Sequence, residues 1–224
     1  MNVTVNKEKF FANLTNFNPS SQAKIRMLSL FSASLTFDDA PITTLAINRA
    51  VELQVNNEEL YEVVLQSYLF LGFPRMLQAA ELLHRIAPVN HTPLEKSVFL
   101  STTDFDKLYK RGEEACQKVY GSKFEILKER VLGYAPDIYH WMILEGYGKV
   151  LSRGVLSLEH RELSVVAFLT MENRKRQLHS HIIGAVHAGA TLKLISQIVD
   201  DIGESAGEGY FSAISIIEHL EENS

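Results

Sequence analysis

The sequence has few of the residues that mark specialised classes of protein. Only one of its 224 residues is a cysteine, Cys116, and only six are prolines. One thiol forms neither an intramolecular disulfide nor a Cys-x-x-Cys redox pair, so a disulfide scaffold is excluded. The chain also lacks a basic excess, because its formal net charge is −5 and no stripe of Lys and Arg is present. We therefore expect no nucleic-acid partner.

Long hydrophobic runs are absent as well, although 46% of the residues are hydrophobic. The apolar stretches are too short and too interrupted to span a bilayer, so we expect no membrane partner. The amino-terminal stretch MNVTVNKEKFFANL lacks the apolar centre of a secretory signal peptide. These features predict a cytoplasmic, globular protein.

Apolar residues recur instead at three- and four-residue spacing along almost the whole chain. Within residues 105–121, for example, Phe105, Leu108, Cys116 and Val119 fall on one helical stripe. Strand-like patterning is scarce and is confined to a short candidate at residues 96–102. The sequence therefore predicts an all-α fold.

Prolines and helix-capping residues interrupt the helical pattern around residues 89–103, which predicts a linker there. A first repeat would then span residues 1–88 and a second would span residues 104–224. When the first half is shifted by 135 residues, residues 24–86 align with the second half without a gap. Because the apolar periodicity stays in phase, we predict two tandem copies of one helical unit, packed with pseudo-twofold symmetry.

Local signals mark several helix ends in these copies. In the second copy, Gly189 suits the left-handed conformation that often follows a helix, and Thr191 can cap the next helix. In the first copy, Asn56 and Glu59 have the spacing of a capping box.

A family resemblance covers nearly the whole chain. The stretch LSLEHRELSVVAFLTMENRKRQLHSHIIGAVHAGATLKLISQIVDDIGESAGEGYFSAISIIEHL resembles the carboxymuconolactone decarboxylase family, as do RGEEACQKVYG, APDIYHWMILEGYGKVLSR and NNEELYEVVLQSYLFLGFPRMLQAAELL. The resemblance implies compact helical units and a homo-oligomer, either a trimer or another ring of repeats. It also implies a small-molecule ligand and one of two chemistries: cofactor-free decarboxylation of a lactone, or peroxide reduction by the alkylhydroperoxidase D-like branch.

Glu162 and His181 are the candidate catalytic residues. His181 matches the family histidine, eight residues before Gly189, and Glu162 matches the glutamate of the peroxidase-like branch. Measured along two antiparallel helices from a turn near Asn173, Glu162 lies roughly 16 Å and His181 roughly 12 Å from the turn. The two residues are therefore less than one helical turn apart along the helix axes, so a contact is feasible. A carboxylate on one ring nitrogen would fix the imidazole tautomer and favour proton transfer at the other. The alternative is a buried pair with a purely structural role.

The residues that define each branch of the family are partly replaced. At the two cysteine positions of the peroxidase-like branch the chain has Arg174 and Gln177, which argues against peroxidase activity and leaves both as candidate substrate-binding residues. Arg153 remains from the Arg-Pro-Gly segment of the decarboxylase branch, but Gly154 replaces the proline. Arg153 either holds a substrate carboxylate or is a solvated arginine at a helix end.

The histidines of residues 177–191 do not have the spacing of a metal site. No pair among His179, His181 and His187 has the i, i+4 spacing that directs two imidazoles at one ion. A metal ion would need a further ligand from Glu162 or from another helix, so we expect no metal. We expect His179 and His187 to lie at the surface or in an interface.

The first copy has Met27 and Ala46 at the positions of Glu162 and His181, so any acid–base site belongs to the second copy. The leading hypothesis is a lyase or isomerase that acts without a cofactor on a small carboxylated or carbonyl compound. His181 would transfer the proton, Glu162 would orient it, and Arg153 or Arg174 would hold an anionic group. The alternative is an oligomeric binding or scaffold protein of the same fold without catalysis.

Overall fold

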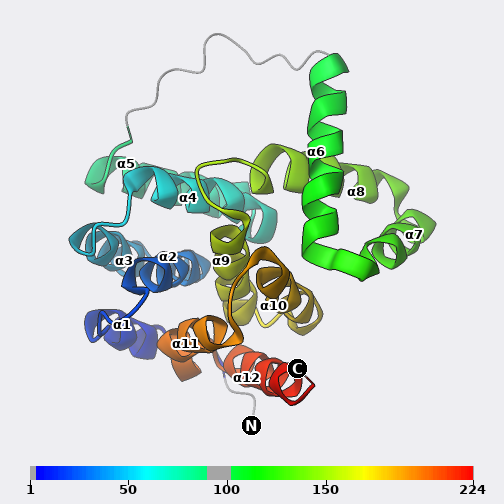
Figure 1. Ribbon diagram of the computed structural model, residues 1–224. Helices are drawn as coiled ribbons and strands as arrows, with labels where there is room; N and C mark the ends of the chain where they lie inside the picture. Colours follow the sequence, from blue (N-terminus) through cyan, green and yellow to red (C-terminus); the bar gives the residue numbers. More distant parts are fainter. Residues whose placement is uncertain (1–3, 90–101, 224) are drawn as a thin grey trace. The chain divides into compact units, whose positions relative to one another are not determined.

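The computed structural model describes residues 4–89 and 102–223, except for the side chains of Thr102 and Thr103 (Figure 1). Within those residues it is helical and contains no strand, which confirms the all-α prediction. The predicted linker, including the strand candidate at 96–102, falls almost wholly outside the described residues. No helix in the described part is both long and apolar enough to cross a membrane.

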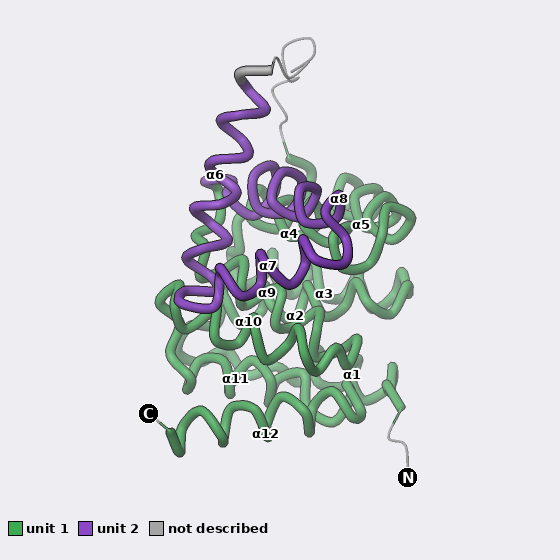
Figure 2. The backbone as a smooth tube through the Cα atoms, turned by 90° about the vertical axis from the view of Figure 1, so that its right-hand side faces the viewer, with its two compact units in different colours: residues 1–89, 155–224 green, residues 90–154 purple. Residues whose placement is uncertain are grey.

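The chain forms two compact units, drawn in green and purple in Figure 2. Unit 1 combines residues 1–89 with residues 155–224, and unit 2 comprises residues 90–154. This division differs from the predicted repeats, because residues 155–224 group with the first half of the chain. The helices of unit 1 are α1 (Lys7–Thr15), α2 (Ala23–Ser34), η1 (Leu35–Phe37), α3 (Ala40–Glu52), α4 (Asn57–Leu71), α5 (Phe73–Ile86), α9 (Leu158–Met171), α10 (Lys175–Ala188), α11 (Leu192–Ile202), η4 (Gly203–Ala206) and α12 (Glu208–Glu222).

Helices α2 and α9 pack against each other in the core of unit 1. Every residue of α2 from Ile25 onward is buried, and so is every residue of α9 from Arg161 onward. Both helices therefore carry apolar residues on all sides rather than on one stripe, as expected for helices surrounded by others. Helices α3, α4 and α11 pack on α2, and helices α4, α10, α11 and α12 pack on α9.

The predicted helix-end signals hold in the structure. Asn56 and Glu59 form the capping box of α4, and the Thr191 side chain accepts a hydrogen bond from Leu194 N–H at the start of α11. Gly189 follows α10 with a φ of 118°, a left-handed conformation that a side chain would disfavour.

The helices in the two segments of unit 1 start at matching positions. Four helices of the first segment have a counterpart in the second whose first residue lies 135 residues later, and one of these pairs is α2 and α9, which start at Ala23 and Leu158. The other three pairs follow the same offset, and their first residues are Ala40 and Lys175, Asn57 and Leu192, and Phe73 and Glu208.

Unit 2 contains α6 (Thr102–Tyr120), η2 (Gly121–Lys123), α7 (Phe124–Tyr134), α8 (Pro136–Trp141) and the π-helix η3 (Met142–Leu151). Its core lies where α6 packs on η3 with the backbones in close approach. A Cβ atom on Gly112 would overlap the carbonyl oxygen of Ile143, and one on Gly148 would overlap that of Leu108. Glycine at these two positions is what allows the two helices to approach so closely.

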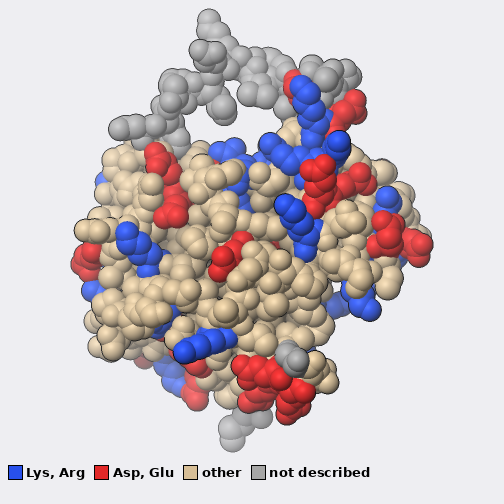
Figure 3. All heavy atoms as spheres, viewed as in Figure 1, with Lys and Arg blue, Asp and Glu red and all other residues tan. Residues whose placement is uncertain are grey.

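Charged side chains of both signs are interspersed on the face shown in Figure 3. An acidic group near the end of α12 comprises Glu218, Glu221 and Glu222, all exposed. On that face, the described Lys and Arg side chains form no continuous stripe, in keeping with their even distribution in the sequence.

Candidate functional site

Glu162 on α9 and His181 on α10 meet inside unit 1. Glu162 Oε2 lies 2.7 Å from His181 Nδ1, a distance typical of a hydrogen bond to a charged acceptor. The predicted Glu–His contact is therefore confirmed. Glu162 is 0% exposed and His181 is 6% exposed, so the pair is shielded from bulk water.

Local structure explains why the two side chains come together. The Ser157 side chain caps α9, and the chain reverses after α9 through Asn173, whose φ of 48° is left-handed. Helices α9 and α10 then pack side by side, which brings Glu162 and His181 to the same depth. The contact depends on helix rise and on the position of the turn, and both could be read from the sequence.

The second carboxylate oxygen of Glu162 is the unusual feature of the site. Within the described part of the chain, Oε1 is buried and has no hydrogen-bond partner. Leaving a buried polar group unsatisfied costs about 1–3 kcal/mol, and more for a charged group. Such an oxygen is an acceptor that a ligand hydroxyl, a ligand N–H or a water molecule could satisfy.

An aromatic wall lies beside the imidazole. The ring of Phe70, near the end of α4, meets the His181 ring edge-on with centroids 6.2 Å apart. Phe70 also stacks on the fully buried Phe168 of α9, with centroids 5.6 Å apart. Phe70 is only half-buried, so it is the part of this wall nearest to solvent. Sequence reasoning did not single out Phe70, because its spacing only indicates a helix-packing surface.

The predicted substrate-binding residues lie at the surface. Arg174 and Gln177 are exposed at the start of α10, and the Arg174 guanidinium lies 3.7 Å from the Glu172 carboxylate. Arg153 is exposed too, but it belongs to unit 2, so the structure does not place it relative to His181. The substrate-binding role of all three remains a prediction.

The other two histidines of α10 are also exposed. His179 and His187 lie on the outside of the helix, whereas His181 faces the core. Within the described residues, no group of three or more His, Cys, Asp or Glu side chains is placed to hold a metal ion.

The first segment of unit 1 has apolar side chains at the positions aligned with the pair. Met27 and Ala46 are both fully buried. Neither side chain can transfer a proton, so the acid–base pair occurs once in this unit.

Three cavities of unit 1 lie away from the pair. Their volumes are about 330, 620 and 540 Å³, and neither Glu162 nor His181 lines any of them.

No known protein-family model matches the chain. Over 135 residues, 59% of its length, the chain is 29% identical to the protein called Peroxisomal protein 2 of the yeast Schizosaccharomyces pombe. The matched stretch covers 62% of the yeast protein, which is less than two thirds of that relative's length.

Proposed function

We propose that the protein is a carboxymuconolactone decarboxylase-like enzyme that moves a proton on a small carbonyl or carboxylated compound without a cofactor. The observation that carries this proposal is the buried hydrogen bond between Glu162 Oε2 and His181 Nδ1, with Glu162 Oε1 left unsatisfied. The reaction class is that of a lyase or an isomerase.

In this proposal each residue has a distinct role. The Glu162 carboxylate accepts a hydrogen bond from His181 Nδ1–H and so fixes the tautomer in which Nε2 is the basic nitrogen. When Nε2 takes a proton from the substrate, the imidazolium is stabilised by the same carboxylate 2.7 Å away. Glu162 is thus a positioning residue, and His181 is the group that exchanges the proton.

The unsatisfied oxygen supports a functional role over a structural one. A pair that served packing alone would be more stable if a second donor satisfied Oε1, or if apolar residues replaced both partners. Retaining a buried acceptor is the kind of local cost that proteins accept at functional sites.

Substrate approach would involve the start of α10. Gln177 lies one helical turn before His181 on α10, and Arg174 directly precedes the helix. Arg174 would hold the anionic group of the substrate at the surface, and the half-buried Phe70 would move aside to expose the ring.

The test is deuterium exchange at the carbon next to the carbonyl group. Purified protein in D₂O is mixed with a panel of small lactones and keto acids, and exchange is followed by proton NMR. We expect His181→Gln to reduce catalysed exchange by about 10²-fold or more, and Glu162→Gln to reduce it less. His179→Gln is the matched control, because that residue is exposed on the same helix. Exchange that persists in folded His181→Gln protein would refute the assignment.

A non-catalytic binding or scaffold protein is the second candidate. The burial of both side chains, and their absence from the three cavities, favour it. For this candidate, the wild-type protein would catalyse exchange on none of the compounds, while Glu162→Gln would lower thermal stability.

We also propose that unit 1 is built from two copies of one helical unit with pseudo-twofold symmetry. Two buried arginines at aligned positions support this. Arg26 on α2 pairs with Asp201 on α11 at 2.7 and 2.5 Å, and Arg161 on α9 contacts Gln66 on α4 at 3.3 Å. Asp201 and Gln66 also occupy aligned positions, and a reciprocal contact of this kind is characteristic of a twofold axis.

Assembly and cellular location follow as proposals from the same resemblance and from the yeast relative. We expect a homo-oligomer, and sedimentation equilibrium of the purified protein would show its size. The name of the yeast relative favours the peroxisome over the cytoplasm as the location. A fluorescent fusion compared with a peroxisomal marker would distinguish the two.

A further inference from the structure

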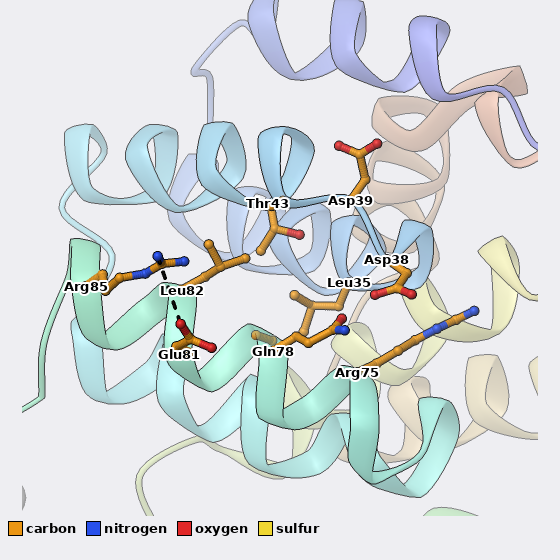
Figure 4. Close-up of a pocket in the computed structure, with 11 residues that line it drawn as sticks. Leu35, Asp38, Asp39, Thr43, Arg75, Gln78, Glu81, Leu82 and Arg85 are labelled. Carbon is orange, nitrogen blue, oxygen red and sulfur yellow. Dashed lines mark ion pairs between the residues drawn. The ribbon is translucent and has the colours of Figure 1, made fainter.

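Charges of one sign gather at two helix ends of unit 1. The start of α10 carries a basic cluster of exposed side chains at its N-cap and first two positions, namely Arg174, Lys175 and Arg176. The end of α12 carries an acidic cluster of exposed side chains, namely Glu218, Glu221 and Glu222 (Figure 3). By contrast, exposed charges of opposite sign lie close together on α5, where Glu81 is 4.0 Å from Arg85 (Figure 4).

Little in unit 1 neutralises either cluster. Arg174 lies 3.7 Å from the Glu172 carboxylate, but Lys175 and Arg176 form no ion pair or side-chain hydrogen bond with any described residue. The glutamates of the acidic cluster likewise have no side-chain partner in the described part of the chain. Because like charges on neighbouring helical positions repel one another, each cluster carries a cost that its own chain does not offset.

Each cluster also lies at the helix end where its charge is least favourable. A helix has a partial positive charge at its amino-terminal end and a partial negative charge at its carboxy-terminal end. The first turn of α10 has no acidic residue and its N-cap forms no side-chain hydrogen bond, so the basic cluster adds to a positive end. The acidic cluster adds to the negative end of α12, where His219 is the only basic residue of the last turn. A surface of opposite charge would stabilise either end.

The two clusters lie at different ends of α12. The start of this helix is next to the turn before α10, because Ser212 Oγ is 3.3 Å from Asn173 Oδ1. The acidic cluster lies six to ten residues farther along α12, or about 9–15 Å. Exposed charges are largely screened beyond about 8 Å at physiological ionic strength, so the clusters do not compensate each other within one chain. A second copy of the chain supplies the missing charge to both.

Phe211 adds an apolar surface beside the basic cluster. Its side chain is 47% exposed, and it directly precedes Ser212, which contacts the turn before α10. Aromatic residues and arginines are enriched in protein interfaces. The basic cluster and Phe211 therefore combine charge with the apolar area that an interface needs.

We propose that the acidic cluster at the end of α12 docks on the basic cluster at the start of α10 in a second copy of the chain. Lys175 and Arg176 provide the cations, since Arg174 is close to Glu172 and is assigned to the substrate. Two helix ends of opposite partial charge then face each other. This inference identifies the contact of the homo-oligomer proposed above, and it rests on that proposal.

The test is sedimentation velocity of the full-length protein and of two charge-reversed variants. Lys175→Glu with Arg176→Glu makes both surfaces negative, and Glu218→Lys with Glu222→Lys makes both positive. We expect each variant alone to associate at least about 100-fold more weakly than the wild-type protein, because like charges face each other. When the two variants are mixed in equal amounts, we expect them to assemble, because each supplies the charge that the other lacks.

Two controls accompany these measurements. Lys24→Glu with Lys193→Glu makes the same change in net charge at exposed positions outside the clusters and should sediment like the wild-type protein. Circular dichroism checks that every variant keeps the helix content of the wild-type protein. Where a variant fails to fold, the salt dependence of the wild-type protein decides, since raising NaCl from about 0.05 M to about 1 M should dissociate a contact between exposed charges.

The outcomes separate the contact from the oligomer itself. A wild-type protein that is monomeric at every concentration would overturn both. An oligomer that persists in either charge-reversed variant, variants that stay apart when mixed, or an oligomer insensitive to salt would overturn the contact and leave the homo-oligomer standing. The proton-transfer proposal for His181 is decided separately by deuterium exchange.

Discussion

At the residue scale, buried charges mark where unit 1 differs from an ordinary apolar core. Arg161 is fully buried, and its guanidinium is 2.7 Å from the Glu62 carboxylate and 3.3 Å from the Gln66 side-chain oxygen. Burying both charges is costly, and their attraction offsets that cost only while both are present. The pair therefore ties α9 to α4 without adding much net stability.

We expect Arg161→Met to lower the free energy of unfolding by about 3–5 kcal/mol, because the buried Glu62 carboxylate loses its contact with the Arg161 guanidinium. Urea denaturation followed by circular dichroism measures this change. The double variant Arg161→Met with Glu62→Leu should recover much of the loss, since no lone charge remains. A double variant as unstable as Arg161→Met would show that the destabilisation comes from lost packing rather than from charge.

At the element scale, capping side chains and glycines decide where helices start and how closely they pack. The Asp39 side chain caps α3 and lies 3.0 Å from the Lys7 ammonium. Gly209, in the first turn of α12, contacts the Thr170 carbonyl at the end of α9, and a Cβ atom there would overlap that oxygen. Gly133 on α7 is a helical glycine with open space where its Cβ would be.

The Asp39 carboxylate should make stability depend on pH at acid values. The hydrogen bond from Lys7, followed by that from Ile42 N–H, lowers the pKa of Asp39 below its usual 3.8. Its stabilising effect is therefore complete above pH 3.8 and is lost as the pH falls through the lowered pKa. Asp39→Asn keeps a capping oxygen, so we expect it to cost about 0.3–1 kcal/mol at neutral pH and progressively less as the pH falls through the lowered pKa. A pH-independent difference in urea denaturation would contradict this account.

Two alanine substitutions should change stability in opposite directions. Gly209→Ala should destabilise the protein by about 1–3 kcal/mol, because α12 must move away from α9. Gly133→Ala should stabilise α7 by about 0.5–1 kcal/mol, because alanine is the better helix former and meets no obstacle. Thermal unfolding of the two variants and the wild-type protein shows whether each substitution lowers or raises the melting temperature. If Gly209→Ala melts like the wild-type protein, α12 and α9 are farther apart than described.

At the scale of the whole molecule, unit 1 is made of two segments that are distant in sequence. Residues 1–89 and 155–224 share one core, in which α2 packs on α9 and Arg26 pairs with Asp201. Neither segment can bury its apolar face alone. Unit 1 is therefore discontinuous in sequence, because unit 2 lies between its two segments.

We expect fragments 1–89 and 155–224 to fold only together. When they are co-expressed with an affinity tag on one fragment, both should co-purify and show helical circular dichroism. Each fragment expressed alone should aggregate or remain unfolded. Cooperative unfolding of fragment 104–224 by itself would contradict the shared core and would favour independent repeats.

Features that depend on local spacing could be predicted from the sequence. The helical class, the capping box at Asn56, the left-handed Gly189 and the Glu162–His181 contact all follow from a 3.6-residue period, a fixed rise and the position of a turn. The folded structure was needed to show which segments share a core, that the Phe70 ring lies edge-on beside the imidazole, and that Glu162 Oε1 has no donor among the described residues. These depend on contacts between residues far apart in the chain, and spacing along one helix carries no information about them.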